Sequence, residues 1–160
     1  MEWKRKQNRI TLNNYIGFQI YFVTICTRDK RIVFNDSEIV NENIKLLTQF
    51  CDKYYFDVIV YCYMPDHVHL LVVSQQENAN LVVFIKEYKQ MSGYRYKQRV
   101  GSSLWQKSYY DHILRKEEIS EKVVQYILEN PVRRGLVDDF TKYPYSGSLK
   151  FGNDIFNILS

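Results

Sequence analysis

Two of the chain's three histidines, His67 and His69, stand one residue apart in a β-branched, apolar run. Side chains of a strand alternate between its faces, so both imidazoles project the same way, together with Leu71 and Val73. The opposite face would take Val68, Leu70 and Val72. Two imidazoles so placed can hold one divalent cation between them. A metal site is therefore one hypothesis, and a pair of packed core histidines with hydrogen-bonded nitrogens is the other.

A tyrosine and a carboxamide, Tyr126 and Asn130, lie four residues apart in a segment with helical periodicity. While the helix lasts, this spacing puts both on one face. A phenol, with an ordinary pKa of about 10, becomes a useful nucleophile when a nearby cation stabilises its phenolate. A cation held by His67, His69 and the Asn130 oxygen would also polarise a phosphodiester. Alternatively, Tyr126 is a core aromatic and Asn130, before Pro131, ends the helix.

The expected ligands favour particular metals. Two neutral imidazole nitrogens and one amide oxygen suit Mg²⁺ or Mn²⁺, with water or phosphate in the remaining positions. They do not suit a closed structural Zn²⁺ site. We therefore expect a divalent cation, Mg²⁺ or Mn²⁺, as the cofactor of this site.

The bulk properties of the chain are consistent with one cytoplasmic domain. With 160 residues, we expect a single domain over residues 1–160. A formal charge of +4 permits a polyanionic partner without requiring one. The three cysteines are odd in number and far apart in apolar segments, which is typical of reduced, buried thiols. The charged start and the lack of a long apolar run predict a cytoplasmic location and no membrane association.

The order of predicted elements indicates the fold class. Strands are predicted over 16–27, 56–63 and 67–74 and in a short stretch ending near residue 114, and helices around Val40–Cys51, Leu81–Met91 and Glu117–Asn130. This order predicts an α+β, ferredoxin-like split βαβ fold with a mainly antiparallel sheet. An extra C-terminal helix would carry Tyr126. We expect the histidine strand to be central, with helices on one sheet face and the second face free to present residues.

Several segments together resemble a known family. The chain is similar to single-tyrosine HUH transposases of the insertion-sequence-200 type, and especially to REP-associated tyrosine transposases. The resemblance spans about residues 15–148, and its combination of motifs is more specific than any one of them. The segments that carry it are Met64–Leu71, Trp105–Gln106, Asp111–Arg115, Tyr126–Pro131 and Tyr143–Ser146.

The resemblance implies a function for the residues already singled out. His67 and His69 would bind the catalytic metal, and Tyr126 would attack a phosphodiester of single-stranded or hairpin DNA. The products would be a 5′-phosphotyrosine and a free 3′-hydroxyl, and reversal with another 3′-hydroxyl would rejoin the strand without ATP. Asn130 occupies the position where many relatives carry a glutamine metal ligand.

The resemblance also suggests which other residues meet DNA. Basic side chains that face the DNA would contact phosphates, although each can also be solvated surface. These candidates are Lys86, Lys89, Lys97, Arg115, Arg133 and Arg134. His112 can approach the site or fix the fold through a hydrogen bond, and we expect the second. Trp105 can pack in the core or stack on a base, and we expect it to pack.

Other functions and assemblies stay open at this stage. The first hypothesis is a metal-dependent DNA transposase that cleaves and rejoins strands. The alternatives are a non-cleaving DNA-binding protein on the same fold and a single-tyrosine replication initiator or relaxase. The chain would act as a monomer or as a homodimer.

Overall fold

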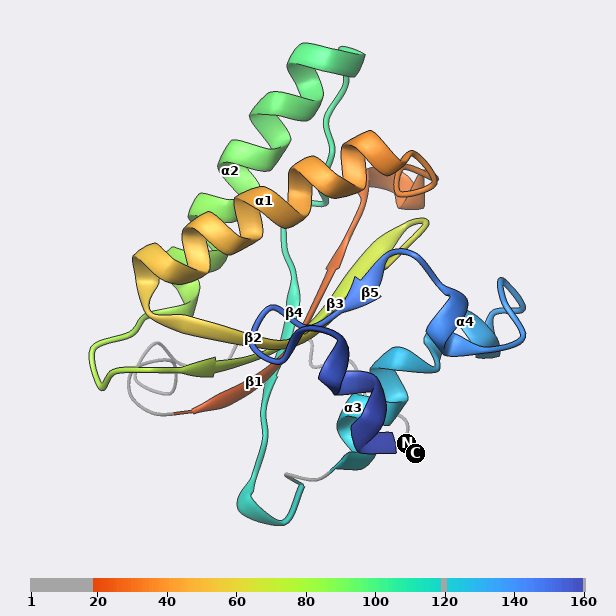
Figure 1. The fold of residues 1–160 in the computed structure, drawn as a ribbon. Coiled ribbons are helices and arrows are strands. Elements are labelled where there is room, and N and C mark those ends of the chain that lie inside the picture. Colours follow the sequence, from red (N-terminus) through yellow and green to blue (C-terminus); the bar gives the residue numbers. More distant parts are fainter. Residues whose placement is uncertain (1–18, 119–120, 160) are drawn as a thin grey trace.

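The computed structural model describes residues 19–118 and 121–159, and Figure 1 shows the arrangement of their elements. The strands are β1 (Ile20–Cys26), β2 (Phe56–Met64), β3 (His67–Ser74), β4 (Tyr110–Ile113) and β5 (Ser146–Gly147). The α-helices are α1 (Ser37–Tyr54), α2 (Leu81–Val100), α3 (Glu121–Leu128) and α4 (Asn130–Arg133). Short 3₁₀ turns are η2 (Arg28–Lys30), η3 (Lys116–Glu118), η4 (Phe140–Lys142) and η5 (Gly152–Leu159).

The strands form one antiparallel sheet in the order β4-β1-β3-β2-β5. The predicted α+β, ferredoxin-like fold with a mainly antiparallel sheet is confirmed, and β3 is the middle strand. Antiparallel register sets which side chains of β1 and β3 meet. Thr24 pairs with His69, and Cys26 pairs with His67. The sheet thus brings these four residues together from segments about 40 positions apart in the chain.

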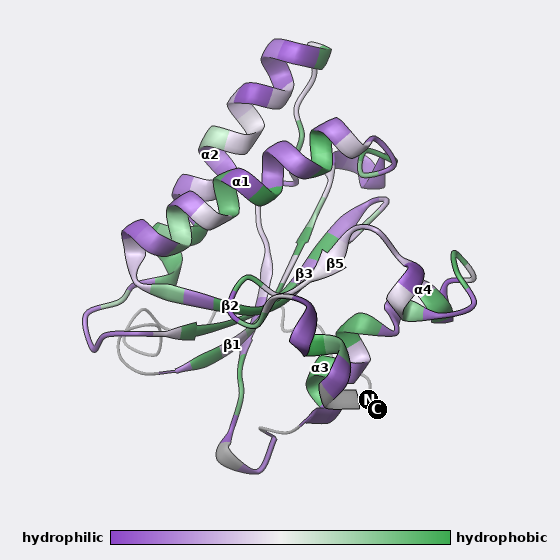
Figure 2. Cartoon of the chain, in the orientation of Figure 1, coloured by the Kyte–Doolittle hydropathy of each residue, from purple (hydrophilic) through white to green (hydrophobic). Residues whose placement is uncertain are grey.

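Two long helices cover one face of the sheet, and each has a defined start (Figure 1). The Asp36 side chain accepts a hydrogen bond from the Glu38 amide at the start of α1, and Asn80 accepts one from the Val83 amide at the start of α2. Gly101 ends α2 with φ 88°, a left-handed conformation that suits glycine. Figure 2 shows hydrophilic and hydrophobic residues alternating along both helices.

The main hydrophobic core lies between these helices and the sheet. It takes alternate residues of β1 and β3, including Val23, Val68 and Leu70, all of which are fully buried. Full burial of one such aliphatic side chain contributes about 1.5–3 kcal/mol. This face also buries Trp105, whose Nε1–H donates to Ser92 Oγ, so the expectation of a packing residue is confirmed.

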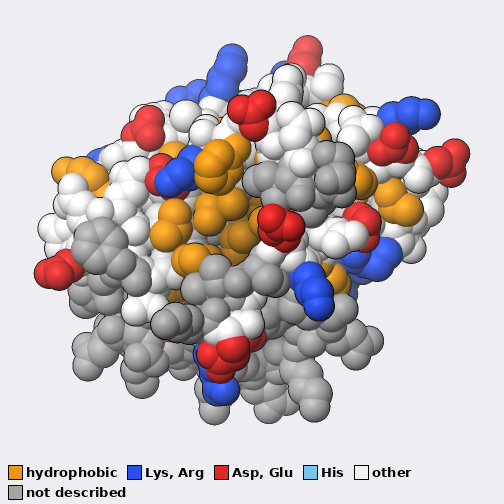
Figure 3. Space-filling model, turned by 60° about the horizontal axis from the view of Figure 1, so that its bottom comes forward, with side chains coloured by type: hydrophobic (Ala, Val, Ile, Leu, Met, Phe, Trp, Pro, Cys, Tyr) orange, Lys and Arg blue, Asp and Glu red, His pale blue; other side chains and the backbone are white. Residues whose placement is uncertain are grey.

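The second sheet face is partly covered, and the expectation that it would be free was wrong. Here Phe22 and Leu71 pack with α3 residues Val123 and Ile127 and with Tyr143 in a second core cluster. The apolar stripe of α3 needs burial, and the sheet face beside the histidines supplies it. Figure 3, which views the molecule from below, shows further hydrophobic side chains at the surface, beside charged side chains.

The predicted helix over 117–130 is divided in the structure. η3 precedes α3, which ends at Leu128, and α4 begins at Asn130. Pro131 lacks the amide hydrogen that a continuous helix would need, so the axis changes there. Tyr126 and Asn130 therefore lie on two consecutive helices rather than on one.

The structure also bears on the cysteines and on membrane association. Cys26, Cys51 and Cys62 are buried thiols, as expected. Within residues 19–118 and 121–159, no helix is both long and apolar enough to cross a bilayer.

Candidate active site

A pocket of about 370 Å³ lies on the second sheet face, at the end of β3 where the histidines stand. Strands β1 and β4 form one wall, and the segment from α3 to α4 forms the other. Of the residues predicted to do chemistry, four line this pocket: His67, His69, Tyr126 and Asn130. The fold thus gathers into one cavity the residues that the sequence pattern singled out.

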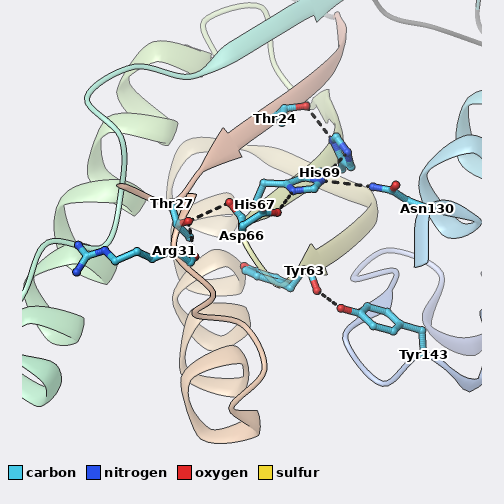
Figure 4. A network of polar contacts seen from close by, with 9 residues as sticks. All are labelled: Thr24, Thr27, Arg31, Tyr63, Asp66, His67, His69, Asn130 and Tyr143. Carbon is cyan, nitrogen blue, oxygen red and sulfur yellow. Dashed lines mark hydrogen bonds and ion pairs between the residues drawn. The ribbon is translucent and has the colours of Figure 1, made fainter. Parts of the chain in front are cut away.

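The two imidazoles converge through their Nε2 atoms, which lie 3.2 Å apart (Figure 4). Each ring is oriented through its other nitrogen. His67 Nδ1 lies 2.6 Å from a carboxylate oxygen of Asp66, and His69 Nδ1 lies 2.8 Å from Thr24 Oγ1. His67 is 7% exposed. His67 is therefore buried and His69 is partly buried. Both are hydrogen-bonded, as a core pair would be, and the pair also faces a cavity.

The pocket favours the neutral form of both histidines. Burial lowers the pKa of His67 below its ordinary value, although the adjacent Asp66 carboxylate opposes this shift. Burial also lowers the pKa of His69, well below its ordinary value, and the nearby guanidinium groups of Arg133 and Arg134 lower it further. Neutral imidazoles retain a lone pair that can bind a cation.

Tyr126 stands at the mouth of this pocket, on α3. Its ring packs against Phe22, with centroids 6.2 Å apart, and the Arg133 guanidinium lies 4.2 Å from the ring centroid. Arg133 also donates from Nη2 to the Tyr126 carbonyl at 2.6 Å. The phenol is half-buried rather than enclosed in the core. This position keeps its ring fixed while leaving it accessible from the cavity.

Asn130 reaches the pocket from the start of α4 and is 6% exposed. Its amide nitrogen lies 3.4 Å from His67 Nε2. Rotation of the amide by 180° would turn Oδ1 toward the same space without moving the backbone. A side chain shorter than glutamine therefore reaches the histidine pair from this position.

These residues fit a divalent cation. A separation of 3.2 Å between the Nε2 atoms is close to the roughly 3 Å edge of an octahedron with metal–ligand bonds of about 2.1 Å. In the part of the chain that the structure describes, no three side chains from His, Cys, Asp and Glu are grouped to hold a metal. A cation bound by His67 and His69 would have to take its further ligands from other groups, with the Asn130 oxygen as one candidate and substrate oxygens as others.

Three cations surround the histidines at the rim of the pocket, namely Lys30, Arg133 and Arg134. Lys30 was missed by the sequence reasoning. It follows Asp29 in a turn where both residues have positive φ, 56° and 51°, an uncommon conformation outside glycine that is often found at functional sites. The residue type of Lys30 does not indicate that it lines the pocket, because the turn that positions it depends on tertiary contacts. The rim can neutralise phosphate charge next to Tyr126.

The other predicted DNA contacts lie outside this pocket. Lys86 and Lys97 are exposed on α2, which covers the opposite sheet face. Lys89, also on α2, donates to the Gln106 carbonyl at 2.8 Å, and Arg115 is exposed beside η3. Contact of these four residues with DNA stays a prediction.

His112 makes a structural hydrogen bond and also lines the pocket. Its Nε2 lies 2.9 Å from Glu118 Oε2, and Glu118 also accepts a hydrogen bond from the Arg115 amide. This contact ties β4 to η3, as expected. His112 also lines the pocket, with its neighbours Tyr110 and Asp111.

Comparison with known proteins identifies the family. Residues 17–130 match the family described as “Transposase IS200 like”. The chain belongs to this transposase family. A Haemophilus influenzae protein named as a REP-associated tyrosine transposase is 30% identical over 139 residues, which cover 79% of this chain and 78% of that protein.

Solved structures share the fold of this transposase. One is a REP-associated tyrosine transposase bound to a REP hairpin, with a TM-score of 0.67 and 19% identity, covering 91% of this chain and 81% of the other. Another is a protein of Deinococcus radiodurans R1 assigned as a transposase, with a TM-score of 0.53 and 22% identity, covering 76% of this chain and 95% of the other.

Proposed function

We propose that this transposase cleaves and rejoins single-stranded or hairpin DNA, with a divalent metal and a 5′-phosphotyrosine intermediate. One observation carries the proposal: Tyr126, a phenol, lines the same cavity as the two converging imidazoles of His67 and His69. The similarity to REP-associated tyrosine transposases supports DNA as the substrate, since one such relative is bound to a REP hairpin. The chain would act as a monomer or as a homodimer.

Tyr126 is the nucleophile in this proposal. Its phenolic oxygen forms a bond to the phosphorus, and the bond from phosphorus to the 3′-oxygen breaks. The phenolic proton is released, and the leaving 3′-oxygen takes up a proton to become a free 3′-hydroxyl. The downstream strand stays attached to the protein through its 5′-phosphate. Attack by another 3′-hydroxyl reverses the step and joins a new strand to it.

His67 and His69 would hold the metal, with Asn130 as a third ligand through its amide oxygen. The cation, Mg²⁺ or Mn²⁺, would supply positive charge that stabilises developing negative charge on phosphate and phenolate oxygens. The neutral state of both imidazoles favours binding at pH 7. Lys30, Arg133 and Arg134 would bind phosphates on either side of the reacting one.

Arg133 has a second task in this scheme. Its guanidinium lies against the Tyr126 ring and is hydrogen-bonded to the carbonyl of the same residue. This pair of contacts limits rotation of the ring, so that the phenol is held in one orientation before DNA arrives. The guanidinium also places positive charge beside Tyr126, where a DNA phosphate would bind.

The test uses hairpin oligonucleotides with randomised single-stranded flanks, incubated with protein and Mn²⁺. The proposal predicts a covalent adduct in denaturing gels that retains a label at the DNA 3′ end and loses one at the 5′ end. Tyr126→Phe should abolish the adduct while DNA binding persists. The matched control is Tyr94→Phe, at an exposed tyrosine of α2, which should behave as wild type. Binding without any adduct would instead favour a non-cleaving DNA-binding protein.

A further inference from the structure

Each histidine of the pair contacts a different kind of group through Nδ1. His67 meets the carboxylate of Asp66, and His69 meets the hydroxyl of Thr24, as Figure 4 shows. The two Nε2 atoms face each other at 3.2 Å, so they cannot both carry hydrogen. A cation between them requires that neither does. The proton on each ring must then sit on Nδ1, where these two partners lie.

The Asp66 contact allows one arrangement only. An ionised carboxylate accepts hydrogen bonds and cannot donate, so the neutral His67 ring donates from Nδ1–H to Asp66. Its Nε2 lone pair is then directed toward His69. Carboxylates that accept from a metal-binding imidazole orient the ring and increase its basicity.

The Thr24 contact allows two arrangements. A hydroxyl can donate to His69 Nδ1, which leaves the hydrogen on Nε2, or it can accept from Nδ1–H. In the first arrangement His69 Nε2–H donates to His67 Nε2 across the 3.2 Å gap. In the second both lone pairs point into the pocket. Thr24 can support either state by rotating its hydroxyl.

The Asp66 carboxylate is delivered by a turn that the fold holds firmly. The Asp66 carbonyl accepts from the amide of Thr27 at 2.9 Å, and Thr27 is fully buried. The neighbouring Pro65 carbonyl accepts from the amides of Val33 and Phe34 at 2.8 and 3.0 Å. Because the segments around Thr27 and Val33 both donate hydrogen bonds to this turn, the carboxylate is held in place before any ligand binds.

We propose that Asp66 and Thr24 are positioning residues of the metal site, with unequal roles. Asp66 commits His67 to the tautomer whose Nε2 is free, whereas Thr24 lets His69 change tautomer when a cation enters. This inference rests on the proposed metal-dependent function. It predicts that loss of the Asp66 carboxylate weakens metal binding more than loss of the Thr24 hydroxyl.

The first measurement is Mn²⁺ affinity of the full chain, by calorimetry or electron paramagnetic resonance. Asp66→Asn keeps the shape of the side chain but removes its negative charge and replaces a group that can only accept a hydrogen bond. It should weaken Mn²⁺ binding about 10- to 100-fold. Thr24→Val should weaken it less, and Thr24→Ser should restore wild-type binding. Asp29→Asn is the control, since it makes the same charge change in the nearby η2 turn. Equal affinity of the Asp66→Asn and Asp29→Asn variants would overturn the inference.

The second measurement is the tautomer of each ring without metal, from ¹⁵N chemical shifts of histidine-labelled protein at pH 7.5. Wild type should show His67 with hydrogen on Nδ1, and Asp66→Asn should show a mixture. Wild-type His67 with hydrogen on Nε2 would overturn the inference. Failure of wild type to bind Mn²⁺ would count against the proposed function instead, and the ring spectra would still decide the role of Asp66.

Discussion

The two faces of β3 have different tasks: one packs in the hydrophobic core, and the other lines the pocket. Toward α1 and α2, Val68, Leu70 and Val72 are fully buried in an apolar layer. Toward α3, His67 and His69 alternate with these residues, yet their Nε2 atoms converge beside a cavity. One strand therefore serves stability on one side and chemistry on the other. The alternation of its side chains separates the two tasks by a single residue.

Polar groups follow the same division. On the helical face, Tyr63 and Tyr88 share a hydrogen bond between their hydroxyls, and Tyr88 donates to Asn43 Oδ1. These groups meet one another inside the core. In the pocket, the histidines are bonded through Nδ1 while Nε2 is directed at a shared space. A functional polar cluster thus differs from a structural one because its atoms converge on a space that a ligand can enter.

The largest expected effect is on the pocket side, for His69→Gln. Loss of one imidazole should slow DNA cleavage roughly 1,000-fold, because metal charge stabilisation is worth several kcal/mol. The melting temperature should not fall. His112→Gln is the matched control, since it makes the same change at a pocket histidine outside the converging pair, and it should cost less than about tenfold. Equal losses would show that the converging pair has no special role.

The opposite face should give the opposite result. Leu70→Ala removes a fully buried side chain from the helical core and should lower the free energy of unfolding by about 2–5 kcal/mol. The Mn²⁺ affinity of the folded protein should stay within about twofold of wild type. Urea denaturation and metal titration measure the two quantities. A tenfold loss of metal affinity in folded Leu70→Ala would break the division between the faces.

A smaller effect is expected from pH, in metal-free protein. Folding lowers the pKa of His67 and His69 below 6.5, so below that pH the unfolded chain binds protons that the folded chain does not. The contribution of the two histidines to the free energy of unfolding should be fully present above pH 6.5. It should decrease as the pH falls below 6.5, by at most about 1.4 kcal/mol per pH unit for each histidine. Denaturation at several pH values should show a shallower slope for the double variant His67→Asn/His69→Asn. Stability that rises toward pH 6 would contradict this assignment.

The sequence predicted much of this arrangement because strand alternation is local. His67 and His69 on one face and Val68, Leu70 and Val72 on the other follow from a period of two. Pro131 correctly predicted an interruption of the helix. It did not indicate that a second helix begins at Asn130. The identity of the family rested on motifs far apart in the chain, which no single element would reveal.

Other parts of the site could not be read from the sequence. The contact of Thr24 with His69 depends on the register between β1 and β3. The position of Lys30 at the pocket depends on a turn with left-handed backbone conformation, which tertiary contacts hold. Asp66 directly precedes His67 in the chain, and a carboxylate beside a histidine of a His-x-His pair is a signal that could have been used. Tertiary geometry, rather than residue type, decides these three roles.

The most direct test of the account locates the covalent bond between DNA and protein. The adduct formed with hairpin DNA and Mn²⁺ would be digested with nuclease and trypsin and analysed by mass spectrometry. Trypsin releases residues 123–133, which contain one tyrosine, Tyr126. The proposed mechanism predicts a nucleotide attached to Tyr126 through its 5′-phosphate. A nucleotide on another residue, or cleavage without any protein-linked strand, would contradict it.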